Sequence, residues 1–77
     1  MAFEKLRELL RLNNALIDAE KRKHHSESRL VEIMNRKHIH PALRRQLIER
    51  LGEDIYTTER EIIDLRDRLD AMKEATA

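Results

Sequence analysis

The stretch NRKHIHP, residues 35–41, divides the chain into two halves that each have the residue pattern of a long helix. Pro41 disfavours the helical conformation for the residue before it, His40. Pro41 itself suits the first position of a new helix, where its missing N–H costs nothing. The chain has no Gly or Pro before Pro41. We therefore expect a helix over about residues 3–36, a turn over about 37–40 and a second helix over about 41–74.

Apolar residues recur along both halves at steps of three and four, which is the period of a helix seam. The seam of the first half consists of Leu9, Leu12, Leu16, Ala19, Lys23, Ser26, Leu30 and Ile33. The seam of the second half consists of Leu51, Ile55, Thr58, Ile62, Leu65, Leu69 and Met72. Two such helices and a short turn predict an all-α antiparallel hairpin, a single domain over residues 1–77. Facing residues in it have numbers that sum to about 76 or 77.

Gly52 is the weakest point of the second helix. Glycine follows the last turn of many helices, and Thr58 and Glu61 have the spacing of a capping box for a further helix. The apolar seam nevertheless passes Gly52 without losing its phase, which favours one continuous helix. We expect a local kink near Gly52, and a break that divides the second helix is the alternative.

The hairpin is expected to form a homodimer, a two-fold four-helix bundle. A chain of this length buries only about 60% of its unfolded surface. Each helix buries one apolar stripe against the other helix. Aliphatic residues outside these stripes remain exposed on the flanks: Leu10, Ile17, Val31, Ile48 and Ile63. A second copy is the usual way to cover such residues. In overall plan the chain resembles the small plasmid-encoded regulators of the Rop type, which are dimeric helical hairpins. The resemblance covers the architecture and no sequence motif.

Composition argues against several classes of protein. The chain has no Cys, so neither a disulfide nor a thiolate metal site can form. It has no Gly-rich phosphate loop and no HExxH motif, and its N-terminal stretch MAFEKLRELL lacks a signal-peptide core. No uncharged stretch approaches the roughly 20 residues that span a bilayer. We therefore expect a cytoplasmic protein that is not an enzyme, with no cofactor and no small-molecule substrate.

Charge is distributed unevenly although the net charge is only +1. Residues 20–50 hold nine Lys or Arg against four acids, whereas residues 51–77 hold four against eight. All four His lie in the basic part. Glu20 with His24, or His38 with His40, has metal-ligand spacing, but neither pair supplies the three or four ligands of a structural site, and we expect no metal.

The stretch EKRKHHSESR, residues 20–29, contains no apolar side chain and places Lys23 and Ser26 on the seam. In the expected register these residues lie opposite Leu51 and Ile55, so the hairpin would have a polar waist. The stretch is either a solvated face neutralised by neighbouring acids or a surface that binds anions.

We expect a protein-binding module, of the adaptor, chaperone or inhibitor type, that covers an acidic partner surface. Nucleic-acid binding through the basic middle and turn is the alternative, although no aromatic residue is interleaved there for stacking. A purely structural dimerisation element is the third possibility. The candidate partner-binding residues are cations and aliphatics of the middle and turn: Lys21, Arg22, Lys23, His24, His25, Arg29, Arg44, Arg45, Ile48, Leu51, Ile55 and Tyr56.

Overall fold

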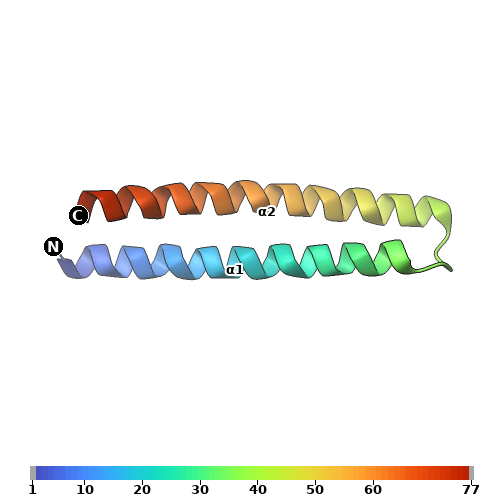
Figure 1. Ribbon diagram of the computed structural model, residues 1–77, viewed down its shortest axis with the longest axis horizontal. Helices are drawn as coiled ribbons and strands as arrows, with labels where there is room; N and C mark the ends of the chain where they lie inside the picture. Colours follow the sequence, from blue (N-terminus) through green and yellow to red (C-terminus); the bar gives the residue numbers. More distant parts are fainter. Residues whose placement is uncertain (1, 77) are drawn as a thin grey trace.

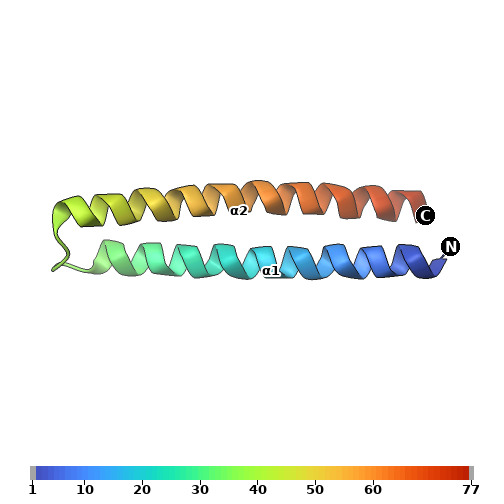
Figure 2. The same cartoon turned by 180° about the vertical axis from the view of Figure 1, so that it is seen from behind.

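Two long helices form an antiparallel hairpin, which confirms the predicted all-α fold. The computed structural model describes residues 2–76, with α1 at Ala2–Asn35 and α2 at Pro41–Thr76. Figures 1 and 2 show the helices side by side along their whole length, with both chain ends at one end and the turn at the other. The molecule measures 57 × 14 × 14 Å. It is therefore a rod that is only two helices thick.

The turn between the helices is built around His40 and Pro41. The N–H of Arg44 donates to the carbonyl of His40 at 2.9 Å, which is the first hydrogen bond of α2. The Nδ1 atom of His40 accepts a hydrogen bond from the N–H of Ala42 at 3.2 Å. His40 thus satisfies one of the free N–H groups at the start of α2, the task that Ser, Thr, Asp or Asn usually performs. Pro41 stands at the first helical position, as its geometry predicts.

Gly52 lies inside an uninterrupted helix. The alternative of a second helix broken at this residue is wrong, because α2 runs from Pro41 to Thr76. The backbone of Gly52 does not adopt a positive φ. A Cβ atom at this position would meet nothing within 4 Å. The continuous apolar seam on either side therefore outweighs the conformational freedom of a single glycine.

The substitution Gly52→Ala is expected to raise the free energy of unfolding by about 0.5–1 kcal/mol, since alanine restricts the unfolded chain and meets open space in the helix. Urea unfolding followed by circular dichroism, at one fixed protein concentration, measures the change. An unchanged or lowered free energy would show that the helix needs glycine here.

The core is a single row of side chains between the helices. Its buried cluster consists of Leu12, Ala19, Ile62, Leu65 and Leu69, with Leu9, Ala15, Leu16 and Met72 packed against it. Ile33 is buried separately near the turn. The only buried polar side chain among residues 3–75 is Thr58, whose hydroxyl donates to the carbonyl of Asp54 at 2.7 Å. Apart from Ala15, these are seam residues, so the apolar period correctly selects the face that each helix buries.

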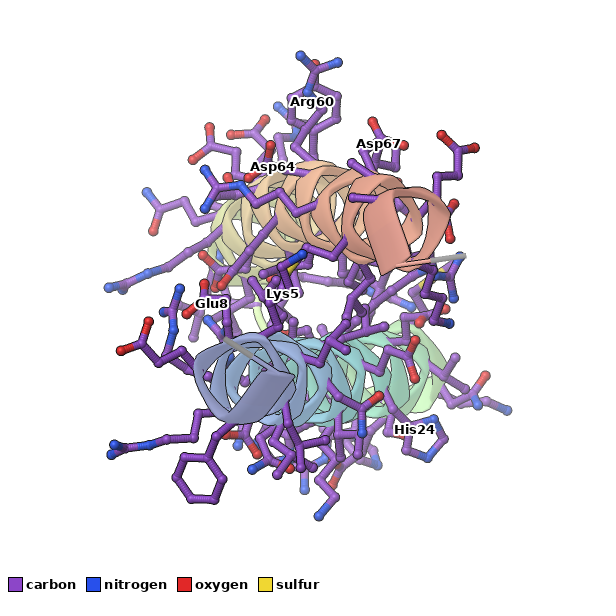
Figure 3. The ribbon with its side chains drawn as sticks, turned by 90° about the vertical axis from the view of Figure 1, so that its left-hand side faces the viewer. Lys5, Glu8, His24, Arg60, Asp64 and Asp67 are labelled. Carbon is purple, nitrogen blue, oxygen red and sulfur yellow. The ribbon has the colours of Figure 1, made fainter. Side chains whose placement is uncertain are left out.

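The hairpin has two different flanks, and the ion pairs between the helices show which residues lie on each. Glu20 and Arg66 directly follow the core residues Ala19 and Leu65, and they pair across the helices at 3.1 Å. Arg22 and Glu61, which directly precede seam positions, pair at 2.9 Å. Residues that follow the seam on both helices therefore share one flank, and residues that precede it share the other. In the end-on view of Figure 3, His24 of α1 lies on the first flank, and Glu8 of α1 with Asp64 of α2 lies on the second.

Glu8 also takes part in a local ion pair on the second flank. Arg11 donates to its carboxylate, three residues away along α1. This hydrogen bond lowers the pKa of the Glu8 carboxyl and raises the pKa of Arg11. Both side chains are exposed, so the pair orders the surface of α1 and adds little to stability.

Candidate partner-binding surface

The cations of the polar waist are paired with acids of α2. Besides Arg22 with Glu61, the ammonium group of Lys23 lies 3.3 Å from Glu59. Lys23 is half-buried, with its side chain 33% exposed. The pairing follows from the antiparallel arrangement, which brings the acidic part of the chain against the stretch that is basic in sequence. Leu51 and Ile55 are half-buried as well. At the waist, ion pairs therefore connect the two helices.

A shallow groove of about 510 Å³ crosses the waist on the second flank. Its walls carry cations from one helix and acids from the other: Lys21, Arg22, His25 and Ser26 on α1, and Asp54, Thr57, Thr58 and Glu61 on α2. Both signs of charge face the same space, and the Thr58 hydroxyl is already bonded to its own helix. The groove consequently offers no concentrated positive field to an anionic partner.

The twelve predicted residues do not come together into one surface. Lys21, Arg22 and His25 line the waist groove, whereas His24 lies on the opposite flank. Arg29 is exposed between the waist and the turn. Tyr56 is 63% exposed and lines a separate shallow groove with Glu49, Gly52, Glu53 and Thr57. The linear sequence groups these residues, but the helical twist distributes them around the rod.

Three of the predicted residues meet at the turn, where the structure adds others that the prediction omitted. Arg44, Arg45 and Ile48 line an open groove of about 610 Å³ together with Lys37, Ile39, Pro41 and Glu49. We call this the tip groove. Arg44 also donates to the backbone carbonyl of Met34 and thereby satisfies the end of α1. The spacing of Pro41, Arg44, Arg45 and Ile48 along one helical face is the sequence signal that could have identified the groove.

The charge at the tip is not neutralised as it is at the waist. Arg36 pairs with Glu32 at 2.9 Å, but within residues 2–76 no ion pair forms with Lys37, Arg44 or Arg45. Residues 29–50 hold six Lys or Arg against two acids, a net charge of +4. The remainder of the chain carries −3. The positive charge of the rod is therefore concentrated at the turn.

Metal and membrane sites receive no support from the described part of the chain. Residues 2–76 contain no group of three or more His, Cys, Asp or Glu that could hold a metal ion. Neither α1 nor α2, as far as they are described, is long and apolar enough to cross a membrane.

Comparison with protein-family models, with curated proteins and with solved structures gives no match to this chain.

Proposed function

We propose that this chain is a non-enzymatic protein-binding module that works as a homodimer and binds an acidic partner surface through the tip groove. The sequence predicted a binding surface over the basic middle and the turn, and the proposal narrows it to the turn. The observation that carries the proposal is the cluster of cations around an aliphatic floor at the tip. Within residues 2–76 no ion pair forms with Lys37, Arg44 or Arg45, although Glu49 also lines the groove.

The chemistry of the tip groove suits an acidic segment that also carries an aliphatic side chain. Ile39 and Ile48 are half-buried, and Pro41 lies beside them. Lys37 and Arg45 border this floor with charges that are free to pair. Apolar contact supplies affinity, and complementary charge supplies orientation and a faster encounter.

A protein partner fits the tip groove better than a nucleic acid does. The groove contains no aromatic side chain on which a base could stack. The acidic remainder of the rod would repel a phosphate backbone that extends beyond the turn. An aliphatic floor, by contrast, matches the side chains of Leu, Ile or Val in a peptide segment.

Homodimerisation is supported by the excess surface of the single hairpin. The chain exposes 6447 Å², whereas a compact monomer of 9.2 kDa exposes about 4,900 Å². The excess of about 1,500 Å² is larger than the roughly 800 Å² that each partner buries in a stable interface of standard size. No large side chain among the described residues is completely buried. A second copy would complete the core that one copy cannot build.

Selection of peptides from a random display library tests the tip groove. We expect the selected peptides to combine Asp or Glu with Leu, Ile or Val, and the double variant Lys37→Glu, Arg45→Glu to bind them at least tenfold more weakly. The matched control is Lys5→Glu, Arg7→Glu, which makes the same change of charge at the other end of the rod. Fluorescence anisotropy with a labelled selected peptide measures the affinities.

Two results would contradict the proposal. If the tip and control variants weaken peptide binding equally, the tip groove is not the site. If the chain instead retards a 20-base-pair RNA or DNA duplex, and the tip variant abolishes that retardation, the partner is a nucleic acid.

A further inference from the structure

We propose that two copies of this chain pack in antiparallel orientation through the first flank, with α1 of one copy against α1 of the other. This inference rests on the proposed homodimer and adds its surface and its orientation. Four observations on the exposed side chains and on the charge carry it.

The first observation is a second apolar seam on α1. Its residues form what we call the outer row: Phe3, Leu6, Leu10, Ile17, Val31 and Met34. Each of them is between 41% and 70% exposed in the single hairpin. Their steps of three, four and multiples of seven are those of a helix that packs against a further helix. An exposed row with this period is the signature of an unfilled helix interface.

The second observation is that the two large exposed apolar residues in the body of α2 lie on the same flank. Tyr56 is 63% and Ile63 is 55% exposed, and they directly follow the seam residues Ile55 and Ile62. Four residues of the outer row likewise follow the seam of α1 by one position: Leu10, Ile17, Val31 and Met34. The Glu20–Arg66 pair shows that such positions of the two helices share one flank. The exposed Leu43 is the exception, and it lies near the turn.

The third observation is the symmetry of the outer row about its own centre. The outer row extends from Phe3 to Met34, so its midpoint lies between Asp18 and Ala19. A two-fold axis at this level places Phe3 beside Met34 of the second copy, and Leu6 beside Val31 of the second copy.

The fourth observation is the distribution of charge. In the antiparallel dimer the positive tip of each copy, at +4, lies beside the end of the other copy that holds the termini, where residues 1–12 and 66–77 carry a net charge of only +1. A parallel dimer would instead put two positive tips side by side, and it would set Glu20 and Glu27 each against its own copy. Like charges at such distances repel, so the charge pattern selects the antiparallel orientation.

The ion pairs at the waist are compatible with this interface. Glu20 with Arg66 and Lys23 with Glu59 are already paired within one copy, so covering them does not leave an isolated charge. The turn residues 36–40 extend past the beginning of the second copy. The outer end of each tip groove therefore stays open, and the dimer carries one partner site at each end.

Sedimentation equilibrium of matched variants tests the surface. We expect the unmodified chain to sediment at twice 9.2 kDa at micromolar concentration. Leu10→Asp should raise the dimer dissociation constant tenfold or more, and Leu43→Asp should leave it unchanged. The two leucines are exposed alike, at 53% and 50%, but only Leu10 belongs to the outer row.

Pulsed electron–electron resonance tests the orientation on a chain whose outer row is intact. The sequence has no Cys, so His38→Cys accepts a single spin label at the exposed turn. The antiparallel dimer predicts a label-to-label distance close to the 57 Å length of the rod. A parallel dimer predicts about 20–25 Å, since α-helices packed side by side lie 8–10 Å apart and the labels add their own reach.

The outcomes separate this inference from the proposed function. A dimer with the short distance, or a dimer that is equally sensitive to Leu10→Asp and Leu43→Asp, overturns the inference and leaves the homodimer standing. A monomer at micromolar concentration overturns both the homodimer and the inference. Peptide binding at the tip is decided independently, by the Lys37→Glu, Arg45→Glu variant. A dimer with the long distance that Leu10→Asp dissociates supports the inference.

Discussion

The substitution Leu65→Ala is expected to lower the free energy of unfolding by about 2–4 kcal/mol. Leu65 is 8% exposed and belongs to the buried cluster with Leu12 and Leu69. Truncation removes buried methyl groups and leaves a cavity in a core that is only one row of side chains deep. A chain of this size has little stability in reserve, so much of its helix content should disappear.

Urea unfolding followed at 222 nm measures this effect, with Leu43→Ala as the matched control. Leu43 is 50% exposed, so its truncation should change the free energy of unfolding by no more than about 0.5 kcal/mol. Equal effects of the two substitutions would mean that the row of residues between the helices is not the core.

The substitution Lys23→Leu is expected to raise the free energy of unfolding by about 1–2 kcal/mol. Lys23 occupies a seam position and its side chain is only 33% exposed, so a leucine there would bury most of its apolar surface. The ion pair with Glu59 that is lost contributes less, because pairs of this exposure are worth about 0–1 kcal/mol. The gain from burial therefore exceeds the loss of the pair.

Thermal unfolding of Lys23→Leu beside Lys21→Leu tests this account. Lys21 is exposed, so the second variant makes the same chemical change without burial and should leave the melting temperature nearly unaltered. A lower melting temperature for Lys23→Leu would show that the pair with Glu59 stabilises the waist more than an apolar contact can. The waist would then be an electrostatic feature of the fold.

Position 23 holds a lysine although a leucine there is expected to make the fold more stable. This lysine bears on how the two helices pair. A fully apolar seam allows helices to slide or to pair in several registers, whereas a charged layer is satisfied in one register only. The pairs of Lys23 with Glu59 and of Arg22 with Glu61 connect the two arms at the level of the waist. In the proposed dimer the two-fold axis lies about one helical turn from this level along α1, between Asp18 and Ala19.

The turn and the helix period made the hairpin predictable from sequence. Pro41 marks the start of the second helix through a local effect: it disfavours the helical conformation of the preceding residue, His40. This effect does not depend on the tertiary contacts of the turn. The steps of three and four selected Leu12, Ile33, Ile62, Leu65 and Leu69 as buried residues, and they are buried. Local rules were also sufficient to favour a continuous helix through Gly52.

The binding surface was less predictable, because the sequence does not show in which direction a charged side chain points or which residues of the other helix it meets. The run from Lys21 to Lys23 is basic in the sequence, yet Glu59 and Glu61 come from the other helix and pair with it. Residues that are adjacent in the run, such as His24 and His25, point to different flanks because each step turns about 100° around the helix. The tip groove, in turn, combines the turn residues Lys37 and Ile39 with α2, and a linear pattern does not show that combination.

The sequence by itself determined the two helices, the position of the turn and the stripe that each helix buries, since these depend on backbone preferences and on the period of apolar residues. Only the tertiary structure decided which charges remain available. Antiparallel packing brings the acidic arm against the basic waist and neutralises it, while the turn has no opposite arm to supply acids. For that physical reason the stretch NRKHIHP has two roles. It separates the two helices, and together with the start of α2 it forms the candidate binding surface.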